Sequence, residues 1–110
     1  MALTLITEPL VPKTSTYTVT LSDRIVLANG TFTVNLYTAV GNVGRVITIK
    51  NTGAGNITVD ARGSETIDGA LTVLLAPKQG FTIESDGATW WIISTIGRTV
   101  IPVGSNLWAQ

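Results

Sequence analysis

The sequence predicts a single all-β domain, an antiparallel β-sandwich or jelly-roll-like fold, and three observations lead to this prediction. Thr, Val and Ile supply 40 of the 110 residues, and their branched side chains fit a pleated sheet better than a helix. Apolar and polar residues alternate with a period of two in several short segments. Gly, Pro, Asn and Asp separate these segments at intervals of about 8 to 12 residues.

The first predicted strands lie on either side of an Asn-Gly pair. A strand is expected from Tyr17 to Leu21, where every second residue is apolar. An apolar run over 24–27 leads to Asn29 and Gly30, and alternation resumes over 31–36. Asn-Gly favours the positive φ angles of a type I′ turn. The sequence therefore predicts a β-hairpin around Asn29-Gly30.

Further turn signals divide the rest of the chain. A strand over 45–50 is followed by the turn 51–55, which predicts a second hairpin into 56–60. Strands containing Leu71 to Leu75 and Phe81 to Ile83 are separated by 76–80, where Pro and Gly mark a turn. The segment 85–88 then reverses the chain into 89–94. No segment has the pattern of an amphipathic helix.

The two ends of the chain differ from this body. We expect an extended N-terminal arm over 1–14, a sandwich domain over 15–96 and a C-terminal arm over 97–110. Both arms are apolar and contain proline, which is confined to sheet edges and extended segments. Apolar arms need a covering surface, on the same chain or on a neighbouring one. The residues expected to make these contacts are Leu3, Leu5, Ile6, Leu10, Val11, Val100, Ile101, Val103, Leu107 and Trp108.

The composition argues against an enzyme. The chain has no His and no Cys, so the commonest general base and the commonest metal ligands are missing. Glu65 and Asp68 form the closest carboxylate pair, but Asp68 precedes Gly69 and is expected to form a turn, as is Asp86 before Gly87. We therefore expect no catalytic residue, no metal, no cofactor and no small-molecule substrate.

Charge and hydropathy bear on partners and location. The seven basic and seven acidic residues cancel, and they are scattered, unlike the clustered positive charge of a nucleic-acid-binding protein. The longest apolar runs are far shorter than the roughly 20 residues of a membrane-spanning helix. Residues 1–4 lack the basic start of a secretory signal. We expect synthesis without export, no nucleic-acid partner and no membrane.

Trp90 and Trp91 are adjacent in a predicted strand. Neighbouring strand residues face opposite sides of a sheet, so one ring is expected in the core and the other on an outer face or interface. Exposed aromatic rings also stack on sugars, which keeps carbohydrate binding open as an alternative.

Three segments together resemble a recurrent module of tailed-bacteriophage structural proteins. They are Gly44 to Asn51, Gly63 to Gly69 and Ser85 to Trp90, and the resemblance covers about residues 16–96. It implies a small β-sandwich that trimerises and carries no catalysis. It also implies packing roles for Ile67 and Trp90. The implied turn residues are Asn51, Asp68, Gly69, Asp86 and Gly87, to which the sequence itself adds Asn29 and Gly30.

The short chain narrows the expected role within a phage particle. Fibre proteins usually join this module to other regions in a longer chain, whereas this chain has only the module and two arms. We expect a capsid decoration (cement) protein, made in the host cytoplasm, that binds the major capsid protein on the capsid exterior as a homotrimer. A small tail, tail-fibre or baseplate component, or a carbohydrate-binding module, is the alternative.

Overall fold

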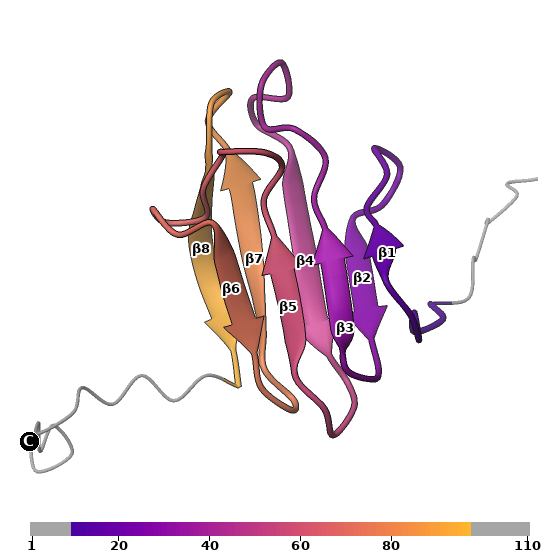
Figure 1. The fold of residues 1–110 in the computed structure, drawn as a ribbon. Coiled ribbons are helices and arrows are strands. Elements are labelled where there is room, and N and C mark those ends of the chain that lie inside the picture. The colour runs from indigo at the N-terminus through magenta and orange to yellow at the C-terminus, as the bar shows by residue number, and fades with distance from the viewer. Residues whose placement is uncertain (1–9, 98–110) are drawn as a thin grey trace, which may run out of the picture.

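Residues 10–97 are described in a computed structural model, and they form two four-stranded β-sheets packed face to face (Figure 1). The prediction of an all-β fold with two packed layers is confirmed. No helix in this part of the chain could cross a membrane. The strands are β1 (Tyr17–Thr18), β2 (Ile25–Ala28), β3 (Phe32–Asn35), β4 (Val46–Asn51), β5 (Ile57–Asp60), β6 (Thr72–Leu75), β7 (Gly80–Ser85) and β8 (Trp90–Ile96).

The two sheets contain both parallel and antiparallel pairs. Sheet I has the order β1-β3-β5-β6, and sheet II has the order β2-β4-β7-β8. The pairs β1–β3, β3–β5 and β2–β4 are parallel, whereas β4–β7, β5–β6 and β7–β8 are antiparallel. The prediction of a purely antiparallel sandwich is therefore wrong. The first five strands alternate between the two sheets. Within each sheet, neighbouring strands of this set run parallel.

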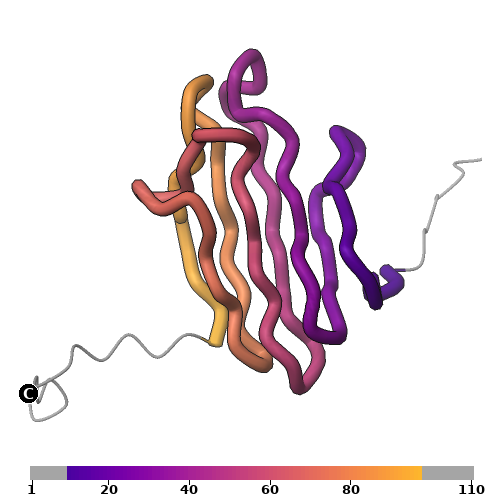
Figure 2. The backbone as a smooth tube through the Cα atoms, in the orientation of Figure 1, coloured from indigo at the N-terminus to yellow at the C-terminus, as the bar shows by residue number. Residues whose placement is uncertain are grey.

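The hairpin predicted at Asn29-Gly30 is also wrong. β2 and β3 lie in different sheets, so this segment is an arch that carries the chain from one layer to the other (Figure 2). Asn29 does not have the positive φ of a type I′ turn, although Gly30 has a φ of 144°. The error arises because β2 is apolar on both faces, so alternation does not identify its buried side.

A second arch, rather than the predicted second hairpin, joins β4 to β5. Asn51 is fully buried there, and its Nδ2 donates hydrogen bonds to the carbonyl oxygens of Gly55 at 2.7 Å and Leu75 at 2.9 Å. The Gly53 N–H donates to Asn51 Oδ1 at 3.0 Å. A Cβ on Gly53 would lie 2.2 Å from Asn29 Oδ1. Asn51 thus ties β4 to sheet I, and Gly53 lets the two arches stack closely.

Two other predicted turns have the expected form. Asp68 and Gly69 have φ angles of 50° and 89°, and Ile67 and Ala70 exchange backbone hydrogen bonds across them at 2.7 and 2.9 Å. This is the two-residue geometry of a type I′ turn. The turn around Asp86-Gly87 joins β7 and β8 as a true antiparallel hairpin.

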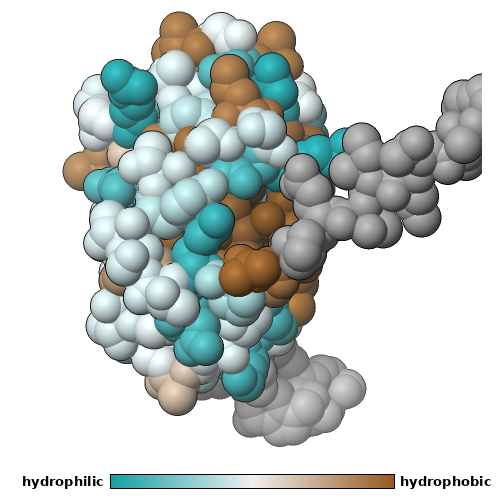
Figure 3. All heavy atoms as spheres, turned by 90° about the vertical axis from the view of Figure 1, so that its right-hand side faces the viewer, coloured by the Kyte–Doolittle hydropathy of each residue, from teal (hydrophilic) through white to brown (hydrophobic). Residues whose placement is uncertain are grey.

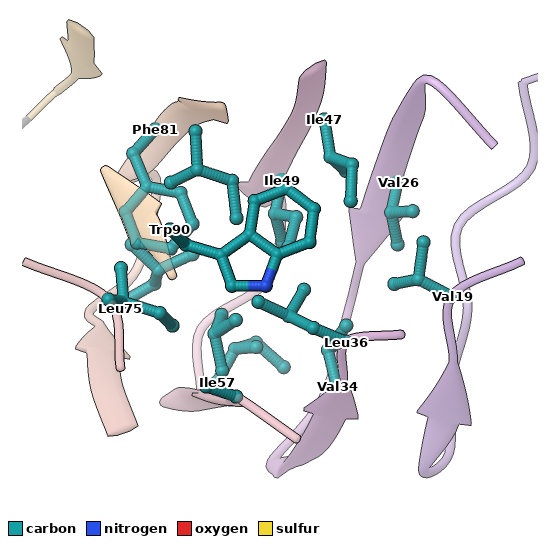
Figure 4. Close-up of a cluster of buried hydrophobic side chains, with 14 of the residues drawn as sticks. Val19, Val26, Val34, Leu36, Ile47, Ile49, Ile57, Leu75, Phe81 and Trp90 are labelled. Carbon is teal, nitrogen blue, oxygen red and sulfur yellow. The ribbon is translucent and has the colours of Figure 1, made fainter. Parts of the chain in front are cut away.

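The core fills the space between the sheets, with Trp90 near its centre (Figure 4). The Tyr37 ring meets Trp90 edge to face, with centroids 5.5 Å apart and an interplanar angle of 66°. Trp90 Nε1 is buried and has no hydrogen-bond partner in the described structure. The buried apolar residues are Val19, Val26, Ala28, Val34, Leu36, Tyr37, Ala39, Ile47, Ile49, Ile57, Val59, Ala61, Ile67, Leu75, Phe81, Ile83 and Trp90.

Candidate interaction surface

Three segments, Gly44 to Asn51, Gly63 to Gly69 and Ser85 to Trp90, meet at one end of the sandwich. The Gly44 N–H donates to Ser85 O at 2.8 Å, and the Trp90 N–H donates to Thr66 O at 2.9 Å. The Ile92 N–H, just beyond the third segment, donates to Asp68 Oδ1 at 2.8 Å. Hydrogen bonds therefore join segments that lie far apart in sequence into one connected structural unit.

The outer face of sheet I is polar. Burial alternates along its strands, so every second residue points away from the core. Asn35 pairs with Asp60, and Asp60 pairs with Thr72, in one row across this face. The outward residues of its strands are Thr18, Thr33, Asn35, Thr58, Asp60, Thr72 and Leu74. Leu74 is the one large apolar residue among them, so this face suits contact with water.

The outer face of sheet II is more apolar. Ile25 is 49% exposed, Val46 45% and Trp91 47%. Ile93 and Ile96, on the edge strand β8, are exposed as well. The centre of the face carries Thr48 and Thr82, whose hydroxyls are hydrogen-bonded at 2.8 Å. Apolar side chains are thus concentrated on the two edge strands, β2 and β8, and at one end of β4.

Trp90 and Trp91 divide as expected, since Trp90 is buried and Trp91 lies on the outer face. Trp91 Nε1 donates a hydrogen bond to Asp86 Oδ2 at 2.7 Å, which holds the exposed ring in place. Asp86 Oδ1 accepts the N–H groups of Ala88 at 2.9 Å and Thr89 at 2.8 Å. These hydrogen bonds, that from the indole foremost, lower the pKa of Asp86 below its ordinary value.

Two shallow depressions lie side by side on this face and share Gly44. The one beside Trp91 has a volume of about 430 Å³ and includes Ile93, Glu84 and Asp86 in its lining. The one beside β2 has a volume of about 480 Å³ and is lined by apolar residues together with Asp23, Arg24 and Arg45. The first therefore carries two carboxylates, and the second two guanidinium groups and one carboxylate.

Asp23, the acidic residue of the basic depression, is occupied within the chain. It accepts hydrogen bonds from the Tyr17 hydroxyl at 2.5 Å and from the Thr20 N–H at 2.8 Å. Partial burial raises the pKa of Asp23, but these hydrogen bonds outweigh it and the pKa is lowered. Asp23 is therefore a structural carboxylate that fastens the loop before β2.

The described residues begin and end at opposite edges of sheet II. The Lys13 N–H donates to Leu27 O at 2.8 Å, and Lys13 O accepts the Asn29 N–H at 2.9 Å, so the chain enters along the β2 edge. Lys13 Nζ also lies 4.5 Å from the Tyr17 ring centroid. Gly97 follows β8, the strand at the other edge. Figure 3 faces the β1/β2 side, where hydrophobic side chains gather between hydrophilic ones.

Of the expected arm contacts, only Leu10 and Val11 fall within the described residues, and both are exposed. The other eight lie outside them: Leu3, Leu5, Ile6, Val100, Ile101, Val103, Leu107 and Trp108. The sequence prediction missed Ile25, Val46 and Ile93 as surface residues. In β2 and β8 the available signal was a run of consecutive apolar residues, because such a run places apolar side chains on both faces of the strand.

Within residues 10–97, no three acidic side chains gather in a group that could hold a metal ion. Comparisons of the chain with protein-family models, with curated proteins and with solved structures found no match. The candidate functional region therefore rests on the residues themselves, and it is the outer face of sheet II with the two chain exits at its edges.

Proposed function

We propose that this chain is a non-enzymatic structural protein of a bacteriophage particle, a cement protein that binds the outside of the capsid as a homotrimer. The sequence resemblance to phage structural modules supports this proposal, because its three segments form one hydrogen-bonded unit. The apolar arms supply the contacts to the major capsid protein.

The position of the chain exits is the observation that carries the proposal. The arms continue from opposite edges of one four-stranded sheet, which are about 14 Å apart at the usual strand spacing. Such a body starts its two arms at separate points, which suits contact with two different neighbouring surfaces. This arrangement is the one expected of a protein that clamps adjacent capsid subunits.

Binding of this kind stabilises the shell by mass action. A protein that binds the assembled shell, but not the free subunits, shifts the assembly equilibrium toward the shell. Three linked copies strengthen the effect, since the second and third arms bind at a high effective concentration. The arms need only weak individual contacts under this mechanism.

Co-sedimentation with capsids prepared without this chain tests the proposal. Wild-type protein is expected to sediment with the shells, and variants lacking residues 1–9 or 98–110 are expected to remain in solution. Both deletions spare Lys13 and the strands, so circular dichroism should show an unchanged β-sheet spectrum. Full shell binding by both truncated proteins would contradict the arm mechanism. Binding of wild type to tails but not to shells would replace it with a tail role.

The exposed Trp91 ring keeps glycan binding as a second candidate. However, the Trp91 N–H and both Asp86 oxygens already take part in hydrogen bonds within the chain. Of the polar groups in this depression, Glu84 has the side chain best placed to meet sugar hydroxyls. Titration of host-surface oligosaccharides into wild type and Trp91→Ala distinguishes the candidates, because glycan binding requires a signal that the variant loses.

A further inference from the structure

The two depressions on sheet II are complementary in charge and alike in their apolar content. Glu84 and Asp86 give the depression on the β7/β8 half a negative charge, next to Trp91 and Ile93. The depression on the β2/β4 half has Arg24 and Arg45. A surface that carries both halves of such a pair fits a second copy of itself.

The acidic half has the features of an anchor. Trp91 is fixed by its hydrogen bond to Asp86, so little side-chain entropy remains to be lost when the ring is covered. Tryptophan is also among the residues that most often dominate the binding energy of protein interfaces. Glu84 lies beside Trp91 in the register of β7 and β8 and is half-buried.

The basic half has the features of a receiving surface. Leu21 and Ile25 are both exposed and line the depression together with Tyr37. Arg45 places one N–H 3.4 Å from Leu21 O, a long contact that leaves most of its donors for other partners. Asp23 keeps its negative charge, but the two guanidinium groups of Arg24 and Arg45 outweigh it, so this half stays positive.

We infer that copies of this chain associate through the outer face of sheet II, with the Trp91 half of one copy packed on the Arg24/Arg45 half of the next. The apolar residues of both halves are buried in this contact, and Glu84 and Asp86 meet the guanidinium groups at its rim. Charge complementarity of this kind fixes which halves meet, because two identical halves repel.

This contact names the surface that joins the copies of the proposed homotrimer. The number of copies itself rests on the proposed function. Each copy offers one acidic and one basic half, and a head-to-tail contact between different halves forms a ring such as a trimer when the rotation between copies closes. The same halves would form a two-fold dimer if both pairs of halves met between two copies. Sheet I, with its polar outer face, remains outside either assembly.

Charge reversal, measured by sedimentation equilibrium of the full chain over a range of concentrations, tests this surface. Arg24→Glu and Glu84→Arg are each expected to raise the dissociation constant about tenfold, because each places like charges across the contact. The double variant is expected to restore association, since it exchanges the two signs. Asp60→Arg on the outer face of sheet I is the matched control and should leave association unchanged. Added salt should weaken the wild-type assembly.

The outcomes separate this surface from the proposed function. Restored association of the double variant supports the proposed surface, whether the assembly is a trimer or a dimer. A dimer contradicts only the proposed number of copies. If Arg24→Glu, Glu84→Arg, the double variant and Trp91→Ala all associate as strongly as the wild type, the proposed surface is wrong, and the cement role is unaffected. Wild type that stays monomeric at every concentration also overturns the surface, and shell co-sedimentation then decides separately whether a monomeric cement protein remains.

Discussion

The outer faces of the two sheets differ although both sheets have four strands and share one core. Sheet I turns Thr, Asn and Asp side chains outward, with Leu74 as the exception. Sheet II turns Ile25, Val46 and Trp91 outward, and Trp91 is held in place by a carboxylate. Core packing does not require this difference, because the outward residues contribute little to the space between the sheets. The difference is the basis of the contact proposed above for sheet II.

Replacing the two adjacent tryptophans gives the largest expected contrast between the core and the outer face. Trp90→Ala should destabilise the fold by about 3–5 kcal/mol, because it leaves a large cavity among buried side chains. Trp91→Ala should change stability by about 1 kcal/mol or less, because the ring is half exposed. Urea unfolding of both variants measures the difference.

Trp90→Phe refines this test. The buried Trp90 N–H has no hydrogen-bond partner, so phenylalanine removes no bond and eliminates a buried donor. Its cost should lie well below that of alanine. Equal losses for the two substitutions would mean that a hidden partner, such as an ordered water, holds the indole N–H.

Asn51→Asp should break the main polar link between the sheets and lower stability by about 3 kcal/mol. The substitution keeps the shape but replaces the amide donor with an oxygen that faces the carbonyls of Gly55 and Leu75. Asn35→Asp, on the polar outer face of sheet I, is the matched control and should have little effect. Thermal unfolding of both variants at neutral pH measures this, and equal shifts would contradict the role of the buried amide.

Gly53→Ala should disturb the stacking of the two arches and cost about 1–3 kcal/mol, because the new methyl group would overlap Asn29 Oδ1. In an Asn29→Ala background the same substitution should cost less, since the overlapping amide is gone. A double-mutant cycle of unfolding free energies measures this coupling. Strict additivity would show that the arches do not press on each other.

The smallest expected effect concerns the fixed ring on sheet II. The pKa of Asp86 is lowered in the folded chain, so its stabilising hydrogen bonds are fully present above the ordinary Asp pKa of about 3.9 and are lost as pH falls through the lowered value. Asp86→Asn should remove this pH dependence from the Trp91 fluorescence. Identical acid titrations of the two proteins would show that the carboxylate does not control the ring.

The two layers of this fold could be predicted from the sequence, but the connections between the strands could not. The alternation predicted over 31–36 agrees with the burial of Val34 and Leu36, and Asp-Gly correctly marked the turns at Asp68 and Asp86. A hairpin and an arch have the same local signature, because both join two alternating segments through Gly and Asn. The choice depends on which face of Ile25–Ala28 is buried, and that is decided by β4, more than 20 residues away.

The candidate surface was only partly accessible to the same reasoning. Strand alternation predicted that one of the two tryptophans would be exposed, and the structure identifies it as Trp91. The pairing of Glu84 with Trp91 follows directly from the turn between β7 and β8, whereas a β-bulge beyond this pair shifts the register at Thr82 and Ile83. A bulge changes which residues share a face, so alternation alone could not show that Ile96 lies on the same outer face as Trp91.

The stacked arches make this molecule a short solenoid. Ile25 pairs with Thr48 and Phe32 with Ile57 in parallel register, so each of these coils takes about two dozen residues, whereas Tyr17 pairs with Val34 after a shorter coil. Each coil adds about 4.8 Å of height. The antiparallel strands β6, β7 and β8 close one end of the stack, and the short β1 and the Lys13 bridge close the other. A whole extra coil inserted between these caps would move the two ends of the described body further apart without altering either of them.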